Sequence, residues 1–203
     1  MSGLRDRNKR ARTERILQAA RELIRERQLH SVTLDQIAHH AQVAPATIFN
    51  LVGSREQLFA ALVDQAHDQL TAALADTPED NPAERVRAIV ATLVSIFVSD
   101  RDVYRQVLTQ WRESGTMLRA SPYPSISQAL RDGQATGMLR DDVDPDRVAA
   151  AVLAGCVGAL HQWSVSLISD RTFGERCLYG VDLALAAMAS DDARTALAAR
   201  LSR

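Results

Sequence analysis

The sequence has little of what marks several common protein classes. Aromatic residues make up only 4% of it while alanine is abundant, a balance that favours helix over strand. No apolar run approaches the roughly 20 residues that a helix needs to span a bilayer. The N-terminus lacks the apolar segment of a secretory signal. We therefore expect a helical, cytoplasmic protein that has no membrane partner.

Cysteine is scarce as well. Cys156 and Cys177 are the only two, and neither belongs to a CxxC motif. We expect both to be reduced and buried, with a disulfide as the less favoured alternative. Adjacent His39 and His40 point about 100° apart on a helix, so they cannot chelate one metal ion together. No metal site and no cofactor are expected.

Sequence motifs of common enzymes are missing. There is no GxSxG, HExxH, P-loop or GxGxxG, and the pair Gly155 and Gly158 gives only GxxG within a helical pattern. An enzyme is therefore the disfavoured alternative, and no catalytic residue is assigned.

Charge is distributed unevenly. Residues 1–55 carry ten bases and five acids, a net charge of +5, whereas residues 56–203 carry 14 bases and 20 acids, a net charge of −6. Lys9 is the only lysine, so nearly every base is arginine. A basic head on an acidic body is typical of a module that meets a polyanion at one end. A solvated basic helix face is the alternative.

Apolar spacing and capping signals predict an all-α chain of nine or ten helices. Ile16, Ala20, Leu23 and Ile24 share one face of a helix over about residues 10–27. Thr33 to Gln36 and Ser54 to Gln57 are capping boxes that open two further helices. The other boundaries come from Pro, Asn and Asp signals. The later helices are expected at 34–41, 45–51, 54–76, 82–98, from 101, up to about 137, 145–169, 172–189 and at the C-terminus.

The stretch "AHHAQVAPATIFNLVGSREQLF", residues 38–59, has the outline of a helix–turn–helix. A helix that enters the major groove must be short, exposed and held by a companion helix. Residues 34–41 are the expected companion and residues 45–51 the expected reader. On the reader, Pro45, Ala46, Thr47 and Asn50 can face outward while Ile48 turns inward.

With the segments around it, this stretch resembles the N-terminal domain of the TetR family of bacterial one-component transcriptional regulators. The family pattern is a basic arm followed by "ILxAAxxLxxxxG" and "TxxxIAxxAGVSxGTxYxxFxSKExLF". The spacing holds without a gap over about 50 residues. Matching positions are Ile16, Leu17, Ala19, Ala20, Leu23, Thr33, Ile37, Ala38, Ala41, Val43, Thr47, Ser54, Glu56, Leu58 and Phe59.

The resemblance implies two domains: a three-helix DNA-binding domain at 1–55, and a helical effector-binding and dimerisation domain at 56–203. By the same resemblance, a homodimer binds a near-palindromic double-stranded DNA operator as a repressor, and a small apolar or amphipathic effector releases it. The basic arm and Arg55 would bind phosphates, while Thr47 and Asn50 would read base edges. The expected DNA contacts are Arg12, Thr13, Thr33, Leu34, Pro45, Ala46, Thr47, Phe49, Asn50, Ser54 and Arg55.

The sequence departs from the family pattern around the reading helix. Gln42 replaces the turn glycine, at a cost of about 1–2 kcal/mol if it adopts the left-handed conformation. Ala44 replaces a capping serine and forfeits about 1 kcal/mol, part of which Pro45 recovers. Phe49 replaces a tyrosine that often touches phosphate. Two alternatives stay open: an activator of the same family, or a helical ligand-binding dimer whose DNA-binding domain has decayed.

The body of the chain offers candidates for the two other functions. The small residues of helix 145–169 allow close approach of another helix, and the next helix offers large apolar ones. The expected dimer contacts are Ala150, Ala154, Gly158, Leu178, Val181 and Leu185. The expected effector contacts are Phe97, Tyr104, Trp111, Met117, Tyr123, Met138, His161 and Trp163, each with an ordinary core position as the alternative.

Overall fold

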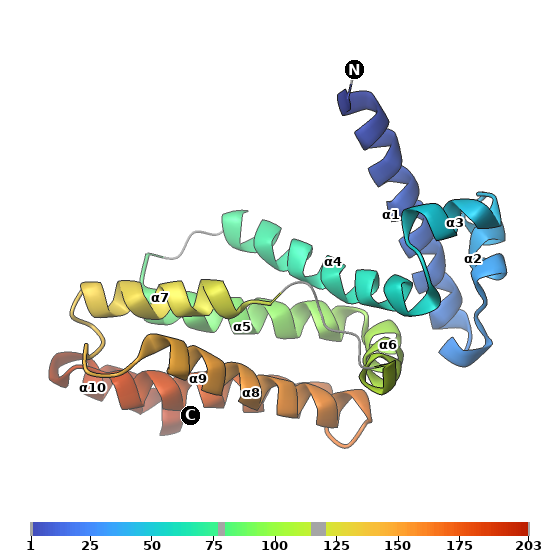
Figure 1. Ribbon diagram of the computed structural model, residues 1–203. Helices are drawn as coiled ribbons and strands as arrows, with labels where there is room; N and C mark the ends of the chain where they lie inside the picture. Colours follow the sequence, from blue (N-terminus) through green and yellow to red (C-terminus); the bar gives the residue numbers. More distant parts are fainter. Residues whose placement is uncertain (1, 77–79, 115–120, 203) are drawn as a thin grey trace. The chain divides into compact units, whose positions relative to one another are not determined.

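A computed structural model describes residues 2–76, 80–114 and 121–202 of the chain. Within these ranges the backbone forms ten α-helices, two short 3-10 helices and one isolated bridge between Leu139 and Ala189 (Figure 1). The all-α fold predicted from the sequence is confirmed. The α-helices are α1 Ser2–Glu26, α2 Leu34–His40, α3 Pro45–Leu51, α4 Arg55–Asp76, α5 Pro82–Ser99, α6 Arg101–Ser114, α7 Tyr123–Ala135, α8 Pro145–Ser164, α9 Asp170–Met188 and α10 Asp191–Ala198.

The chain divides into two compact units. One comprises Met1–Gln65 and Asp100–Arg119, and the other comprises Ala66–Ser99 and Ala120–Arg203. Helix α6 thus belongs with the N-terminal helices because it packs against α1. This division differs from the one expected after residue 55, which grouped α6 with everything that follows it.

The N-terminal unit has its core along the predicted face of α1. Ile16, Ala20, Leu23 and Ile24 are all buried, together with apolar residues of α2, α3 and α4 such as Ile48. Helix α1 begins at Ser2, about eight residues before the start expected from the apolar pattern. The earlier start has a simple cause: residues 2–26 contain no proline, and most are good helix formers that need no buried face. The basic arm is therefore helical.

The second unit is built from α5, α7, α8 and α9, with α10 packed on α9. In Figure 1, α7 runs beside α5 and α8 beside α9. The Asn81 side chain caps α5 through the N–H groups of Ala83 and Glu84, and Asp144 caps α8. In the described residues no helix is long and apolar enough to cross a membrane.

Helix α8 ends at Ser164, five residues before its predicted end at 169. Ser166 adopts φ 61°, in the left-handed region, and the N–H of Leu167 donates to the carbonyl of Gln162 at 2.9 Å. This bond closes the helix with the Schellman pattern. The apolar sequence Val165–Leu167–Ile168 concealed the break, because it gave no glycine signal.

The helix–turn–helix is built as the sequence indicates. The Thr33 hydroxyl accepts from the N–H of Gln36, and the Gln36 amide accepts from the N–H of Thr33, at 3.2 and 2.9 Å. Helix α2 ends in a second Schellman turn, in which the N–H of Val43 donates to the carbonyl of Ala38. Gln42 carries the left-handed φ of 54° that the family pattern reserves for glycine.

Replacing Gln42 by glycine is expected to stabilise the N-terminal unit. The left-handed conformation costs a non-glycine residue about 1–2 kcal/mol, and the extra freedom of glycine in the unfolded chain returns part of that gain. Gln42→Gly should therefore raise the free energy of unfolding by about 1 kcal/mol in urea titrations. Gln42→Ala is the control and should leave it nearly unchanged. A Gln42→Gly variant no more stable than Gln42→Ala would contradict a strained turn.

Candidate nucleic-acid interface

Helix α3 presents a small, mostly apolar surface. Ile48 is fully buried, while Pro45, Ala46, Phe49 and Asn50 are exposed. These four lie at spacings of one, three and four residues, so they share one side of the helix. Phe49 is the largest of them, and 68% of it is exposed. The outward-facing side of α3 is therefore centred on an aromatic ring beside an amide.

Thr47 lies at the edge of this surface, because it is half-buried. Its methyl and hydroxyl groups are thus less available to a partner than the sequence suggested. Ala44, which precedes α3, has an extended backbone and makes no side-chain capping bond. Pro45 occupies the first helical position, as expected from its missing N–H.

Residues that flank α3 use their side chains to order the helix ends. The Ser54 hydroxyl caps α4 by accepting from the N–H of Gln57, and the Gln57 amide accepts from the N–H of Ser54 at 2.8 Å. Ser54 also donates to the Glu56 carboxylate, and this bond lowers the pKa of Glu56. Thr33 and Leu34 hold the equivalent place at the start of α2.

Arg55 has a structural engagement that sequence reasoning missed. Its guanidinium donates to the carbonyl of Leu29 and lies over the ring of Phe59, 5.3 Å from the ring centre. One Nη group and one face of the guanidinium are therefore in use. The remaining N–H groups can still meet an anion, because arginine has five.

The first turns of α1 supply the positive charge. Arg7, Lys9, Arg10, Arg12 and Arg15 are all exposed on this helix. The Thr13 hydroxyl donates to the carbonyl of Lys9 at 3.1 Å, so its own helix already occupies it.

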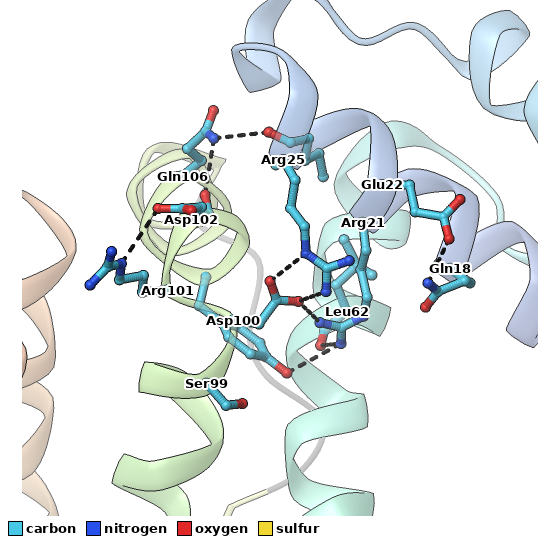
Figure 2. Close-up of polar contacts among 12 residues, drawn as sticks. Gln18, Arg21, Glu22, Arg25, Leu62, Ser99, Asp100, Arg101, Asp102 and Gln106 are labelled. Atoms are coloured by element: carbon cyan, nitrogen blue, oxygen red, sulfur yellow. Dashed lines mark hydrogen bonds and ion pairs between the residues drawn. The ribbon is translucent and has the colours of Figure 1, made fainter.

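A buried arginine links α1 to α4 and α6 inside the same unit (Figure 2). Only 8% of the Arg21 side chain is exposed, and it forms an ion pair with Asp100 at 2.8 Å. Its guanidinium also donates to the Tyr104 hydroxyl, the Leu62 carbonyl and the Gln65 amide oxygen, at 3.2, 3.3 and 3.1 Å. Three N–H groups of one cation thus find acceptors on two helices.

Asp100 receives a second arginine. Arg25 binds both carboxylate oxygens at 2.9 Å, and this bidentate pair raises the pKa of Arg25. Next to it, the Gln106 amide accepts from the N–H of Leu29 and donates to the carbonyl of Ile24. Gln106 therefore satisfies backbone groups that the end of α1 leaves without helical partners.

A more exposed contact ties the end of α2 to α1. His40 Nε2 lies 2.8 Å from the Glu22 carboxylate, which also accepts from Gln18 at 2.7 Å. The hydrogen bond from Gln18, followed by that from His40, lowers the pKa of Glu22.

The expected effector residues are not brought together as one group. Tyr104 is buried in the N-terminal unit, where it serves Arg21. Met117 and the side chain of Trp111 lie outside the described residues. Phe97, Tyr123, Met138, His161 and Trp163 belong to the second unit. Among them, Trp163 is fully buried, stacks on Phe173 and donates to Asp170 at 2.8 Å, which are contacts of an ordinary core residue.

The expected dimer contacts need a correction on α9. Val181 and Leu185 are buried inside the unit, so a partner chain cannot reach them. The hydrophobic spacing placed the wrong side of α9 outward, and its exposed large apolar residues are Tyr179 and Leu183. Leu178 is half-buried.

On α8 the small residues are placed as expected. Ala150, Ala154 and Gly158 are exposed, next to exposed Val157. A Cβ atom placed on Gly155, Gly158 or Gly180 would have no neighbour of the chain within 4 Å. Helices α8 and α9 therefore share an exposed, shallow, mostly apolar surface, which we call the α8–α9 face and define by Ala150, Ala154, Val157, Gly158, Tyr179 and Leu183.

Sequence reasoning missed Arg21, Asp100, Tyr179 and Leu183. Arg21 beside Ala20 and Ile24 was the one available signal, since a base bordering an apolar face often has a partner. Its partner lies 79 positions away, and no local spacing can reveal that.

Comparisons with known proteins agree with this geometry. Residues 16–62 match the family model described as bacterial regulatory proteins, tetR family. The comparison with curated proteins gave no match. Among solved structures, a TetR transcription regulator from Haloarcula marismortui aligns with a TM-score of 0.73 at 18% identity, covering 89% of this chain and 99% of that one.

Two further structures have ligands or targets in their descriptions. SmeT, the repressor of the Stenotrophomonas maltophilia multidrug efflux pump SmeDEF, aligns with a TM-score of 0.65 at 24% identity, covering 89% of this chain and 92% of its own. RolR in complex with resorcinol aligns with a TM-score of 0.65 at 20% identity, covering 98% of this chain and 96% of its own. At these identities the likeness concerns the fold alone.

The two arginines on Asp100 should contribute very differently to stability. Replacing Arg21 by methionine leaves a poorly solvated carboxylate and several acceptors without their donor, so the N-terminal unit should lose about 3 kcal/mol of unfolding free energy. Replacing Arg25, whose side chain is 46% exposed, by methionine should cost less than about 1 kcal/mol. Urea titrations of both variants make the comparison. Equal losses would contradict the distinct role of the buried arginine.

Proposed function

We propose that this chain, whose N-terminal module is that of the tetR family of bacterial regulatory proteins, is a ligand-responsive repressor of transcription. The observation that carries the proposal is the exposed surface of α3, held by two capped neighbouring helices beside a basic helix. A homodimer would place two copies of α3 on the halves of a near-palindromic operator.

The division of labour within the interface follows from chemistry and exposure. The exposed bases of α1 suit phosphates, whose neutralisation makes binding sensitive to salt. Asn50 is suited to bidentate contact with adenine, while Ala46 and the ring of Phe49 suit a thymine methyl group. Thr47 takes a lesser part, because it is half-buried.

Substitution of Asn50 should alter specificity, whereas substitution of Arg12 should alter general affinity. Asn50→Ala should reduce the preference for the selected operator over random DNA by about 1–3 kcal/mol. Arg12→Ala should weaken binding to both DNAs alike and reduce the salt slope by about one unit. Titration of labelled duplexes at several salt concentrations measures both. Arg12 is a cleaner choice than Arg55, which also binds the Leu29 carbonyl.

The same titrations test the proposed function itself. Selection from a random duplex library should yield one near-palindromic sequence for the unaltered protein. The second candidate, a ligand-binding dimer with a decayed DNA-binding domain, rests on the strained Gln42 and the uncapped Ala44. It predicts weak, salt-sensitive binding without a selected sequence. A promoter–reporter assay with the selected operator then distinguishes repression from activation.

Dimerisation is proposed to use the α8–α9 face. Its glycines and alanines permit close helix approach, and a stable interface buries roughly 800 Å² on each partner. The effector is proposed to be a small apolar or amphipathic molecule that binds the second unit. An effector that prefers one arrangement of the two units releases DNA through a differential affinity of about 1–3 kcal/mol.

Leu183→Glu should convert the dimer to a monomer, because it buries a charge in an apolar interface. The matched control is Leu167→Glu, which lies in the turn between α8 and α9 and is also highly exposed, at 73% against 52% for Leu183. Sedimentation velocity at micromolar concentration should give a monomer for the first variant and a dimer for the second. If both variants remain dimeric, the interface lies elsewhere.

A further inference from the structure

The only two cysteines of the chain meet between α8 and α9. Helix α8 packs along α9, and the thiols of Cys156 and Cys177 are joined by a hydrogen bond. Both are free thiols. A disulfide requires Cα atoms about 4.4–6.8 Å apart and sulfur atoms that can approach to about 2.05 Å. Facing positions on closely packed helices can supply this spacing.

The two thiols differ in access. Cys177 is buried, whereas Cys156 is half-buried and lies between exposed Gly155 and Val157. Accepting the hydrogen bond from Cys177 lowers the pKa of Cys156. That same bond, with burial, raises the pKa of Cys177. The thiolate is the form that attacks electrophiles, so the more accessible cysteine is also the more reactive one.

We propose that Cys156 and Cys177 form a reversible oxidation site whose substrate is a small hydroperoxide. The Cys156 thiolate attacks the peroxide oxygen, the O–O bond breaks, and an alcohol or water leaves as Cys156 becomes a sulfenic acid. The Cys177 sulfur then attacks the Cys156 sulfur, which expels water and forms the disulfide. Overall, two thiols and one hydroperoxide give one disulfide, one alcohol and one water.

This site is independent of the proposed regulatory function. It needs only the contact between α8 and α9, both of which lie in the second unit. The disulfide would join residues 21 positions apart in sequence and fix the two helices that carry the α8–α9 face. Such a cross-link restricts the unfolded chain, so the oxidised protein should also unfold at a higher temperature.

The experiment uses the full-length protein, first reduced and then freed of reductant. It is treated with a small excess of hydrogen peroxide, and free thiols are counted after denaturation with a thiol-reactive dye. We expect both thiols to disappear, the intact mass to fall by two hydrogen atoms, and a peptide linking Cys156 to Cys177 to appear in proteolytic digests. Dithiothreitol should restore both thiols, because a disulfide is reversible and a sulfinic acid is not.

Single variants separate the two roles. In Cys177→Ala the sulfenic acid has no resolving thiol, so a dimedone adduct should accumulate on Cys156. In Cys156→Ala the remaining buried thiol should stay largely unlabelled over the same time. Circular dichroism and the thermal unfolding midpoint of each reduced variant serve as folding controls. If a variant unfolds, the unaltered protein still decides through its disulfide peptide and its reversibility.

Three results would overturn the proposal. One is that both thiols survive peroxide in the folded protein but not in the denatured protein, as buried and inert core cysteines would. Another is that the main product is a disulfide between two chains. The third is equal dimedone labelling of the two single variants, which would mean that the difference in access and reactivity does not exist.

Discussion

A single buried cation organises the N-terminal unit. Burying a guanidinium is costly unless its N–H groups and its charge are both satisfied. Arg21 meets this condition through Asp100, Tyr104, Leu62 and Gln65, which lie on α4, on α6 and at the start of α6. Because removing any one partner leaves polar groups unpaired, these contacts fix the position of α1 relative to α4 and α6. Helices α2 and α3 are then held against α1 and α4 by apolar burial, which has no directional preference of its own.

This arrangement explains how the turn tolerates unfavourable residues. Gln42 carries a backbone conformation suited to glycine, and Ala44 leaves the start of α3 without a side-chain cap. Each costs on the order of 1 kcal/mol. The fully buried Ile48, the two capping boxes and Pro45 supply compensating order around the same helix. The family pattern is therefore kept by packing at positions where its turn chemistry has been lost.

The sequence predicted most of the local structure and little of the long-range polar structure. Bounds of α2 and α3 follow from Thr33, Pro45 and Ser54, because capping is a property of a few neighbouring residues. The end of α8 at Ser164 was missed, since Ser166 gives no glycine signal. The outward side of α9 was also wrong, because both sides of that helix are apolar and periodicity alone does not choose between Val181 and Leu183. The Arg21–Asp100 pair has no local signature at all.

Helix α6 shows why such a pair matters for a protein made of two units. Its first residues are held by two arginines of α1, and its Gln106 satisfies backbone groups at the end of α1. The chain nevertheless reaches α6 directly from α5, which belongs to the second unit. Helix α4 likewise begins in one unit and ends in the other. Any ligand that changes where α4 or α5 is most stable must therefore act on the contacts of Arg21. The polar contacts around Asp100 then stand against the preference of the second unit, and their directionality makes an all-or-none response more favourable than a gradual one.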